Sequence, residues 1–357
     1  MTKQKILLTG ASGAVGFEAF QELLKRKDQY DIRILSLDAK QERRLFRPYA
    51  NQVDIVWGDL RDPESVRAAV DGVAAVLHVA ALIPPAADRH PRLAREINLG
   101  GTRNVVAAMR RQPAPPKLIY TSSISVYGDR VDDPHIRVGD PIVPSVGDEY
   151  ARTKIVAESV VRNSGLRWTI LRLCGILTPQ LKIRPLMFHM PLDTALEWCH
   201  SSDAGYALVR TIECDAVDGR IFNLGGGKQC RITAREFLRT MMPIFGVDSG
   251  LIPDYAFAMQ NFHSGYYADG DDLDALLHFQ RKTLQDYIED VQNSVHPVQR
   301  FLARLIPRPI VRQWLLRMSE PLKAIQERDE NLISRFYGSR QAFEKLTKRK
   351  LENISLY

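Results

Sequence analysis

Short apolar runs alternate with stretches of helical periodicity through the first half of the chain. Each run is bounded by polar residues or glycine, which is typical of strands buried on both faces of a parallel sheet. The runs lie at residues 6–8, 32–37, 53–57, 73–79, 117–120 and 168–173. Amphipathic stretches between them, such as 98–109 and 151–163, predict connecting helices. The alternation predicts an α/β fold with a doubly wound parallel sheet.

A glycine turn follows the first predicted strand, in the sequence KILLTGASGAVG at residues 5–16. A strand that enters a helix through a tight turn brings unpaired backbone N–H groups and the positive helix end to one point, where a pyrophosphate can bind. Gly10 permits the turn, Gly13 lets the phosphate approach the backbone, and Gly16 lets the helix lie close to the strand. The sequence therefore predicts a Rossmann-type dinucleotide site that includes Gly10, Ser12, Gly13, Ala14, Val15 and Gly16.

The second predicted strand ends at Asp38, which lies 22 residues after Gly16. A carboxylate at this distance can accept hydrogen bonds from the adenosine ribose, and it would repel a 2′-phosphate. Asp38 therefore favours NAD over NADP as the cofactor. Arg43 and Arg44 would reverse this preference if one of them folded back, although a solvated helix face is the more ordinary role for them.

The alternation becomes irregular after Thr178, where prolines interrupt the pattern. We divide the chain into a dinucleotide-binding part at residues 1–177, a substrate lobe at 178–290 and a helical tail at 291–357. Residues of about 200–225 are expected to return from the lobe to the sheet through a strand at 219–224. Within the lobe, residues 233–242 predict a helix with Glu236 in a capping box, and residues 271–291 are interpreted as one amphipathic helix.

Composition indicates the class of protein and the compartment in which it is expected. The chain has 357 residues, of which 45% are hydrophobic and 25% charged, as in ordinary globular proteins. No signal-peptide pattern and no apolar run of membrane-spanning length stand out, so a cytoplasmic location is expected. The four cysteines have no paired spacing, which predicts reduced thiols and no metal site. They are Cys174, Cys199, Cys214 and Cys230.

The net charge of +7 lies in the tail, because residues 291–357 hold thirteen basic and six acidic residues. Apolar pairs recur there beside an arginine stripe, and two prolines must break any helix. The pairs begin at Phe301, Leu305, Ile310 and Trp314, the arginines are Arg300, Arg304, Arg308 and Arg312, and the prolines are Pro307 and Pro309. The favoured interpretation is a helical appendage whose apolar face packs on the body or on a partner subunit. The alternative is peripheral contact with anionic lipid. No nucleic-acid module is recognisable, and no nucleic-acid partner is predicted.

Candidate chemistry follows the fifth strand, which ends in the serine-rich sequence TSSISVYG at 121–128. A helix then begins near Tyr150 and carries Lys154 four residues later. A phenol has a pKa of about 10 and is a poor base at neutral pH. A neighbouring ammonium and a nicotinamide cation would both favour the phenolate. Tyr150 could then take a proton from an alcohol while hydride leaves the same carbon. A serine hydroxyl from the end of this strand would hold the substrate oxygen, and Lys154 would reach the nicotinamide ribose.

These motifs together resemble the extended short-chain dehydrogenase/reductase family, in its NAD-dependent epimerase/dehydratase branch. They are TGASGAVG at 9–16, GDL at 58–60, HVAA at 78–81, NLGGTRNV at 98–105, SSISVYG at 122–128 and YARTK at 150–154. The resemblance extends from residue 1 to about residue 240. It implies a Rossmann fold, an NAD-dependent enzyme and a homodimer formed through a four-helix contact that includes the Tyr150 helix.

The resemblance also assigns roles to individual residues. It implies Ser123, Tyr150 and Lys154 as catalytic, with Tyr150 and Lys154 also touching the cofactor. Further cofactor contacts are implied for Asp59, Leu60, Ala80, Ala81 and Asn98, and residues 200–203 match a motif at the return of the substrate lobe. Leu82, Ser123 and Tyr127 are expected on the substrate side. Tyr127 has no lysine four residues on, so it is interpreted as structural or as a wall of the pocket, and His78 as a buried strand histidine.

Departures from the family pattern concern the substrate. Family 4,6-dehydratases carry acidic residues after the catalytic hydroxyl, where this chain has Ile124 and Ser125, which argues against dehydration. Many nucleotide-sugar epimerases have an arginine four residues before the position of His200, and here that position is Leu196. The branch that acts on steroid-like or aromatic carbonyls does not need that arginine. The apolar loop 82–85 suits a less polar pocket, as do four aromatics that are equally expected in a core, namely Phe257, Phe262, Tyr266 and Tyr267.

The predicted function is an NAD(P)-dependent oxidoreductase or epimerase that interconverts a secondary alcohol and a carbonyl of a small molecule. The substrate alternatives are a nucleotide sugar and a steroid-like, aromatic or lipidic alcohol or ketone. A non-catalytic dinucleotide-binding sensor or assembly protein on the same fold is the alternative function. The intact set of Ser123, Tyr150 and Lys154 argues against it, because a sensor has no need of all three.

Overall fold

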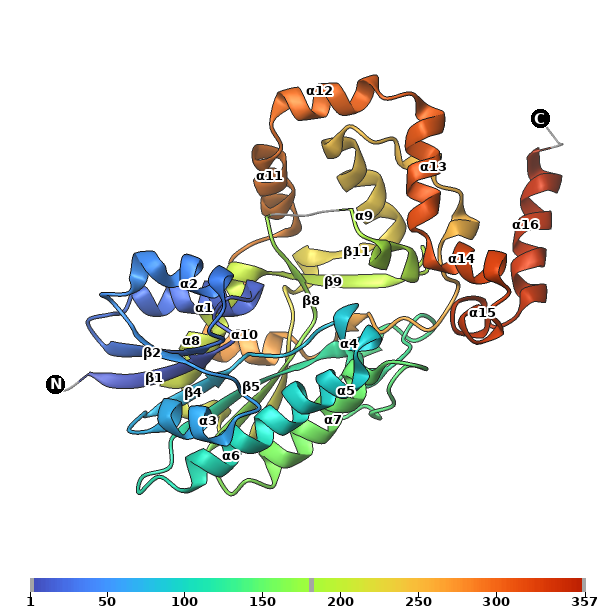
Figure 1. Cartoon of the computed structure of the whole chain (residues 1–357). Helices are drawn as coiled ribbons and strands as arrows, with labels where there is room; N and C mark the ends of the chain where they lie inside the picture. Colours follow the sequence, from blue (N-terminus) through green and yellow to red (C-terminus); the bar gives the residue numbers. More distant parts are fainter. Residues whose placement is uncertain (1–2, 180–182, 355–357) are drawn as a thin grey trace.

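A parallel sheet forms the centre of the computed structural model, which describes residues 3–179 and 183–354 (Figure 1). Its seven strands within these residues are β1 (Gln4–Thr9), β2 (Tyr30–Ser36), β3 (Asp54–Trp57), β4 (Ala75–His78), β5 (Lys117–Ser123), β7 (Trp168–Leu173) and β10 (Arg220–Leu224). They run in the order β10-β7-β5-β4-β1-β2-β3, and all are parallel to their neighbours. The predicted doubly wound Rossmann-type sheet is therefore confirmed.

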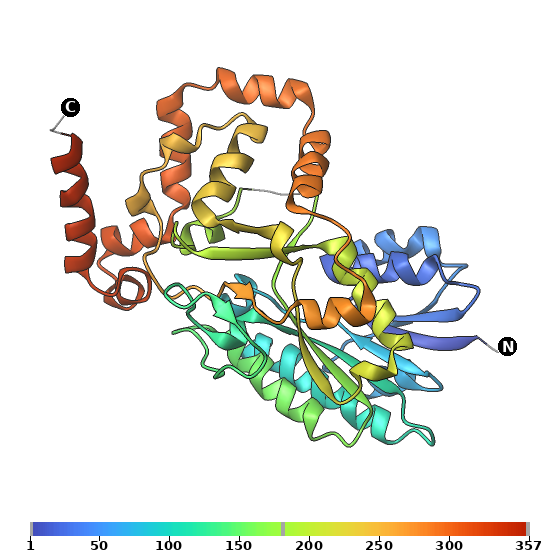
Figure 2. The same ribbon diagram turned by 180° about the vertical axis from the view of Figure 1, so that it is seen from behind.

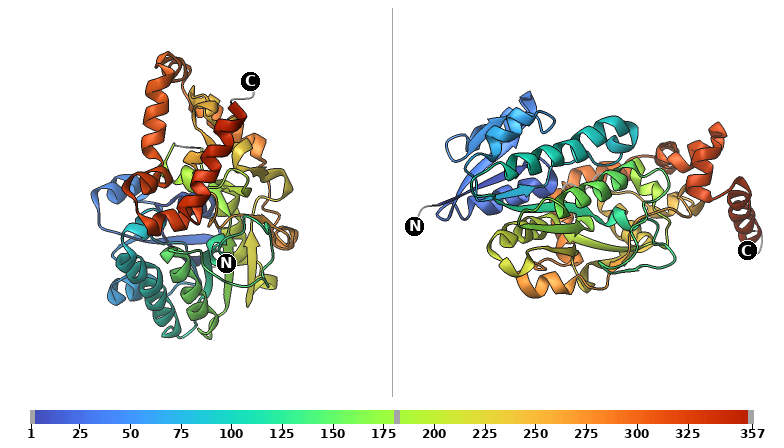
Figure 3. Two further views of the ribbon diagram at one scale, coloured as in Figure 1. Left: turned by 90° about the vertical axis from the view of Figure 1, so that its right-hand side faces the viewer. Right: turned by 90° about the horizontal axis from the view of Figure 1, so that it is seen from below.

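Helices cover both faces of this sheet (Figure 3). One face packs against α1 (Ala14–Leu24), α2 (Lys40–Phe46), α8 (Ser201–Glu213) and α10 (Asp271–Leu277), and the other against α3 (Pro63–Val70), α6 (Gly101–Arg110) and α7 (Glu149–Arg162). The short helices α4 (Ala86–Arg89) and α5 (Pro91–Ala94) and a π-helical segment (Arg95–Gly100) connect β4 to α6.

The central strand β1 shows why a continuous apolar run marks this sheet. Ile6 and Leu8 point into the core under α1 and α8, while Leu7 points into the core under α3 and α6. All three side chains are fully buried. Burial of such a side chain contributes about 1.5–3 kcal/mol, so both faces of the strand must be apolar.

A smaller lobe lies beside the large sheet (Figure 2). It contains a sheet of β8 (Gly175–Leu177), β9 (Ala195–His200) and β11 (Arg231–Thr233), the helix α9 (Ala234–Met241), and the strand pair β6 (His135–Ile136) and β12 (Tyr266–Tyr267). Short 3-10 turns lie at Arg47–Tyr49, Ile124–Tyr127, Pro185–His189, Asp215–Val217, Lys228–Cys230, Met242–Phe245, Ser249–Leu251 and Asp254–Ala256. The capping box predicted for α9 is present between Thr233 and Glu236. The strand predicted at 219–224 is β10 and pairs with β7 in the large sheet.

The prediction of one helix over residues 271–291 is wrong. The structure has α10, which ends at Leu277, and α11 (Leu284–Ser294), separated by a linker that begins with His278 in a left-handed conformation. Asp203 explains the break, because its carboxylate accepts the backbone N–H groups of Arg281 and Lys282 at 2.9 and 2.8 Å. An amide held by a side chain cannot take part in the helical ladder.

The tail consists of α12 (Pro297–Leu305), α13 (Arg308–Met318), α14 (Glu320–Glu327), α15 (Glu330–Tyr337) and α16 (Arg340–Ile354). As predicted, the helix breaks at Pro307, and Pro309 lies in the first turn of α13. Helices α11, α12 and α13 form an arch beyond the small lobe, which we call the arch (Figures 1 and 2). In the described ranges, no helix combines the length and the apolar character needed to cross a bilayer. The division of the chain into three parts remains a prediction.

Candidate active site

The glycine turn between β1 and α1 is shaped by close backbone contacts. Gly10 has φ +76°, and a Cβ on it would lie 2.7 Å from the Ala80 backbone nitrogen. A Cβ on Gly16 would lie 2.0 Å from the carbonyl oxygen of Gly10. Gly13 is the N-cap of α1 and makes no side-chain hydrogen bond, so among the described residues no side chain caps the first N–H groups of this helix. The turn therefore has the form of an anion site, although the phosphate contact predicted for Gly13 remains a prediction.

The carboxyl ends of β1 and β4 meet at the point where the strand order reverses, which is the usual ligand position of an open α/β sheet. His78 at the end of β4 hydrogen-bonds Thr9 Oγ1 at 2.8 Å and Thr102 Oγ1 at 3.0 Å through its two ring nitrogens. It is 1% exposed, and burial lowers its pKa to about 3, with the Lys154 charge adding to the effect. The interpretation of His78 as a buried structural histidine is confirmed.

Asp38 lies just beyond β2 with its carboxylate exposed, and Arg43 folds back onto it. Arg43 Nη2 donates to Asp38 Oδ2 at 2.8 Å, and this hydrogen bond lowers the pKa of Asp38. The guanidinium of Arg43 also lies 4.7 Å from the ring centroid of Trp57. More than half of each charged side chain is exposed, so a ribose could compete for the carboxylate. The structure thus brings the residue that favours NAD together with the one that opposes this preference.

The residues matched to the adenine pocket and the strand end lie around the same edge. Asp59 pairs with Arg61 at 2.6 Å, while Leu60 is 9% exposed, and its carbonyl oxygen accepts a hydrogen bond from Asn104. Ala80 donates its backbone N–H to Thr9 Oγ1. Ala81 follows it, partly exposed at the end of β4.

Asn98 holds the backbone after β4. Its Oδ1 accepts the Leu82 N–H at 2.7 Å, and its amide donates to the Leu82 carbonyl oxygen and to Thr153 Oγ1, both at 3.0 Å. Both amide protons are therefore used within the protein, and the cofactor contact expected of Asn98 remains a prediction. Thr153 in turn donates to the Tyr150 carbonyl oxygen. Asn98 thus connects the loop at Leu82 to the helix that carries the predicted base.

Ser123, Tyr150 and Lys154 come together at the end of β5. Burial raises the pKa of Tyr150 well above its ordinary value, and a hydrogen bond with Ser123 opposes this shift. Lys154 is 2% exposed, its Nζ donates to the Thr121 carbonyl oxygen at 2.8 Å, and it lies 5.7 Å from the centroid of the Tyr150 ring. Burial lowers the pKa of Lys154 to about 7, while Glu158 opposes this shift. The arrangement can hold an oxygen atom between two hydroxyls beside a cation.

The helix carrying Tyr150 is fixed at its N-terminus by Asp148, which accepts the Ala151 N–H at 2.8 Å. The second carboxylate oxygen of Asp148 lies 3.2 Å from His263 Nδ1. Although burial alone would raise it, the His263 contact keeps the pKa of Asp148 below its usual value. The capping residue is therefore ionised, and it anchors the first turn of α7.

Tyr127 belongs to a buried polar network that sequence reasoning missed. Its hydroxyl accepts from Arg172 at 2.7 Å and donates to Asn223 at 2.8 Å, and its side chain is 3% exposed. Arg172 forms a buried ion pair with Glu158 at 2.7 Å. These contacts favour the structural interpretation of Tyr127 over the substrate contact that we predicted. An arginine within the apolar run 168–173 was the available signal, because a buried charge must be paired.

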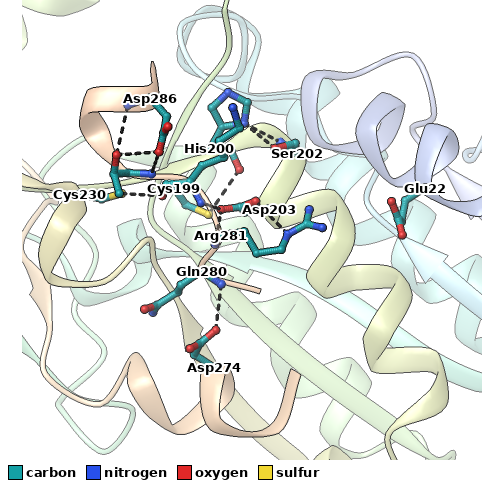
Figure 4. Close-up of polar contacts among 12 residues, drawn as sticks. Glu22, Cys199, His200, Ser202, Asp203, Cys230, Asp274, Gln280, Arg281 and Asp286 are labelled. Atoms are coloured by element: carbon teal, nitrogen blue, oxygen red, sulfur yellow. Dashed lines mark hydrogen bonds and ion pairs between the residues drawn. The ribbon is translucent and has the colours of Figure 1, made fainter. Parts of the chain in front are cut away.

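The residues of the motif at 200–203 make hydrogen bonds within the start of α8 and to a distant segment of the chain (Figure 4). His200 caps α8 by accepting the Ser202 N–H on Nδ1 at 3.1 Å. Asp203, in the first turn of the helix, accepts the backbone N–H groups of Arg281 and Lys282 in the linker. The matched residues therefore join the returning helix to the linker between α10 and α11.

Leu196, the position that bears arginine in many nucleotide-sugar epimerases, is 2% exposed in the core of the small lobe, together with Phe237 and Tyr287. Phe257 is also a core residue, with its ring centroid 5.2 Å from that of Phe188. Tyr267 is 1% exposed in the main core, whereas Phe262 and Tyr266 remain partly exposed. The core alternative therefore holds for two of the four aromatics.

Part of the tail reaches the loop after β4. Glu320 at the start of α14 accepts from His189 at 2.7 Å and lies 3.8 Å from Arg89. Arg335 on α15 lies 3.9 Å from Asp88. In the same loop, the side chain of Ile83 is 58% exposed. The C-terminal helices thus flank an apolar loop beside the predicted site.

Fold and site together define a Rossmann-fold protein with a serine, a tyrosine and a lysine gathered at the carboxyl edge of its sheet. The sequence profile of the 3-beta hydroxysteroid dehydrogenase/isomerase family matches residues 7–188, which is half of the chain. The chain belongs to this family, and the resemblance to extended short-chain dehydrogenases/reductases is confirmed.

Among similar proteins, the 3 beta-hydroxysteroid dehydrogenase/Delta 5-->4-isomerase of Mycobacterium tuberculosis is 31% identical over 165 residues. That match covers 44% of this chain and 42% of the mycobacterial protein. Sanguinarine reductase of Eschscholzia californica is 25% identical over 250 residues, which cover 62% of this chain and 89% of that protein. This chain thus spans less than half of the mycobacterial protein and most of the plant reductase.

Solved structures share the fold. DesIV, a dTDP-glucose 4,6-dehydratase of Streptomyces venezuelae with NAD and TYD bound, matches with a TM-score of 0.68 at 20% identity, over 81% of this chain and 96% of that one. A UDP-glucuronic acid 4-epimerase of Bacillus cereus matches with a TM-score of 0.66 at 18% identity, over 82% of this chain and all of that one. At these identities the likeness concerns the fold alone.

Proposed function

We propose that the protein is an NAD-dependent oxidoreductase that interconverts a secondary alcohol and a ketone on an apolar, steroid-like or aromatic substrate. The observation that carries this proposal is the grouping of Ser123, Tyr150 and Lys154 at the end of β5, beside the glycine turn. Such a complete set supports catalysis over a sensor role, because dinucleotide binding alone requires no buried acid–base pair. The family and the relatives named as dehydrogenases and reductases support the same reaction class.

The residues around the turn suit a dinucleotide. The uncapped N-terminus of α1 would hold the pyrophosphate, Asp38 the adenosine ribose, and Lys154 the nicotinamide ribose. Asp38 and its exposure support NAD, which is also bound in several structures of the same fold. Bound NAD would accept the hydride that leaves the substrate carbon.

In this proposal Tyr150 removes the proton from the substrate hydroxyl during oxidation and returns it during reduction. Ser123 holds the same oxygen and donates a hydrogen bond to it as the carbonyl forms. The buried Lys154 lies one helical turn away, and its positive charge favours the phenolate form of Tyr150. Burial raises the pKa of Tyr150 in the free protein, so the cationic surroundings must lower it before the phenol can act as a base.

An apolar substrate is supported by two features of the chain. Leu196 is buried in the lobe core, so this position offers no cation to a substrate diphosphate. The loop that follows β4 exposes Ile83 and leaves Leu82 partly exposed beside Asn98. Both features favour an apolar ring system as the substrate over a charged nucleotide sugar.

A homodimer through α7 belongs to the same proposal. Val156 on α7 is 43% exposed, and an apolar side chain on this helix is suited to a contact between helices of two copies. Light scattering after size-exclusion chromatography would measure the mass, and a Val156→Asp variant should shift a dimer toward monomer.

The experiment that tests the proposed reaction incubates the protein with NAD and either a 3β-hydroxysteroid or a UDP-hexose, and follows the absorbance of the reduced nicotinamide. We expect turnover with the steroid and none with the sugar nucleotide. Turnover with the sugar nucleotide alone would overturn the substrate class. Tight NAD binding without turnover on any alcohol would favour the sensor alternative.

A further inference from the structure

The apolar side of the arch faces away from the protein. Seven large hydrophobic side chains in α12, in α13 and between them are roughly half or more exposed, namely Val298, Phe301, Leu302, Leu305, Ile306, Ile310 and Trp314. Four of them, at 298, 301, 302 and 305, have the spacing of one helix face. Isolated exposed hydrophobics are ordinary, but a contiguous patch marks an interaction site.

The opposite side of α12 is the one that contacts the body. Gly246 approaches so closely that a Cβ on it would lie 2.7 Å from the Arg300 carbonyl oxygen and 3.0 Å from the Ala303 Cβ. Arg300 also donates to the Ile244 carbonyl oxygen at 3.0 Å. The expectation that the tail packs its apolar face on the body is therefore wrong for α12, and packing on a partner subunit remains a prediction. In α13 the expectation holds, because Leu315 is fully buried in a core shared with the small lobe.

The chain segment that carries this patch has charges of one sign. Residues 291–319 contain five arginines and no aspartate or glutamate. Arg308 pairs with Asp248 at 3.0 Å. Within the ranges that the structure describes, Arg304, Arg312 and Arg317 form no ion pair. A second copy of the chain would bring the same cations to the patch, so self-association through this face is disfavoured.

A groove lined mainly by α13 and α14 has a volume of about 860 Å³. Its lining includes four cations and no acidic side chain, and the cations are Arg308, Arg312, Arg317 and Lys323. Aliphatic stems from Leu251, Pro309 and Leu316 complete the wall. A phosphate attached to a hydrocarbon chain would match both components of this groove.

We propose that the arch binds the surface of a membrane that contains anionic phospholipid. The apolar face of α12 and the exposed Ile310 and Trp314 of α13 enter the boundary between headgroups and acyl chains, and the groove cations contact headgroup phosphates. Trp314, 49% exposed, has the amphipathic ring that is enriched at this boundary. The arch lies flat on one leaflet, as interfacial amphipathic helices do. This surface is separate from the proposed catalytic site.

The test is flotation of the full-length protein with vesicles of phosphatidylcholine alone or mixed with phosphatidylglycerol. We expect binding to the mixed vesicles, weak binding to neutral ones, and release by high salt. Phe301→Ser with Leu305→Ser should reduce binding more than about tenfold, because two apolar side chains no longer enter the lipid. The matched control is Val143→Ser with Val146→Ser, which removes two apolar side chains that are at least as exposed and lie outside the arch.

A charge variant separates the two parts of the proposal. Arg312→Gln with Arg317→Gln should weaken binding to the mixed vesicles about thirtyfold. Arg110→Gln with Arg111→Gln makes the same charge change on exposed residues at the end of α6 and should have little effect. The proposal is overturned by an absence of flotation in the wild type, or by equal binding of the Phe301/Leu305 variant. It is also overturned if that variant only abolishes self-association or capture of an acidic protein.

Discussion

Helices α6 and α12 carry the same pattern in opposite surroundings. In α6, residues 102, 105, 106 and 109 form one face, and each is at most 6% exposed. In α12, residues 298, 301, 302 and 305 have the same spacing, and each is at least 54% exposed. The spacing of apolar residues thus defines a helix face, but it does not say whether that face meets the protein or another phase.

The surroundings explain the difference. Helix α6 lies between α3 and α7 over the sheet, where strands supply apolar partners on the facing surface. Helix α12 contacts the 3-10 turn at Met242–Phe245 with the side that carries Arg300. No part of the described chain covers its apolar face. One helix therefore contributes to stability, and the other remains available for binding.

The largest effect should come from Tyr150→Phe. This variant tests whether catalysis depends on the Rossmann-fold part of the protein and not on the arch. Loss of the phenol should lower the turnover number about a thousandfold while the fold is retained, because the general acid–base group is gone. Phe301→Ser with Leu305→Ser should leave turnover on a dissolved substrate unchanged. Steady-state kinetics on both variants would decide this, and similar losses in the two would contradict the assignment.

Gly10→Ala should destabilise the body by more than about 3 kcal/mol and abolish NAD binding. The added Cβ meets the Ala80 backbone, and φ at this position is positive. Gly72→Ala is the matched control, because φ there is +66° but no atom lies within 4 Å of the added Cβ. It should cost about 1 kcal/mol. Urea unfolding and fluorescence titration with NADH measure both effects, and equal costs would show that the contact with Ala80 is unimportant.

Met109→Ala and Leu305→Ala compare the last positions of the two helix faces directly. Met109 is fully buried, so its truncation should lower the free energy of unfolding by about 3 kcal/mol. Leu305 is 62% exposed, and its truncation should cost less than about 0.5 kcal/mol. Chemical denaturation of both variants provides the comparison. A large cost at Leu305 would mean that its face is covered in solution.

A smaller effect than that of Met109→Ala concerns pH. Burial lowers the pKa of His78 to about 3 from its ordinary value of 6.5. Below about pH 6.5 the unfolded chain therefore binds a proton at His78 that the folded protein does not bind. Stability should therefore fall as the pH falls, by about 2 kcal/mol between about pH 6.5 and about pH 5. His78→Asn should lose this dependence, whereas variation of the exposed His90 should not. Parallel slopes for wild type and His78→Asn in urea unfolding would contradict the account.

The parts of the fold that depend on local pattern were predictable from the sequence. The buried strands around Ile6 and the glycine turn at Gly10 follow from apolar runs and backbone geometry. The prediction failed where distant residues decide, as at the linker where Asp203 takes the amides of Arg281 and Lys282. The network of Arg172 and Tyr127 was missed for the same reason, since a strand pattern does not name the partner of a buried charge.

In the candidate site, too, features that depend on local spacing were predictable, and features that depend on tertiary contacts were not. The spacing of Tyr150 and Lys154 predicted that both lie on one face of a helix, and they do at the edge of the sheet. Asn98 could be found by resemblance, but only the structure shows that its amide protons bind Leu82 and Thr153. Local spacing identified the candidates, and tertiary contacts distinguish groups that face a ligand from groups that position them.

Transfer of a label would test the proposed chemistry most directly. The protein is incubated with NAD and a 3β-hydroxysteroid that carries deuterium on the carbinol carbon, and the reduced nucleotide is analysed by mass spectrometry. We predict NADH with one deuterium from the wild-type protein and none above background from Tyr150→Phe. Unlabelled NADH from the wild type, or equal labelling by Tyr150→Phe, would contradict hydride transfer at this site.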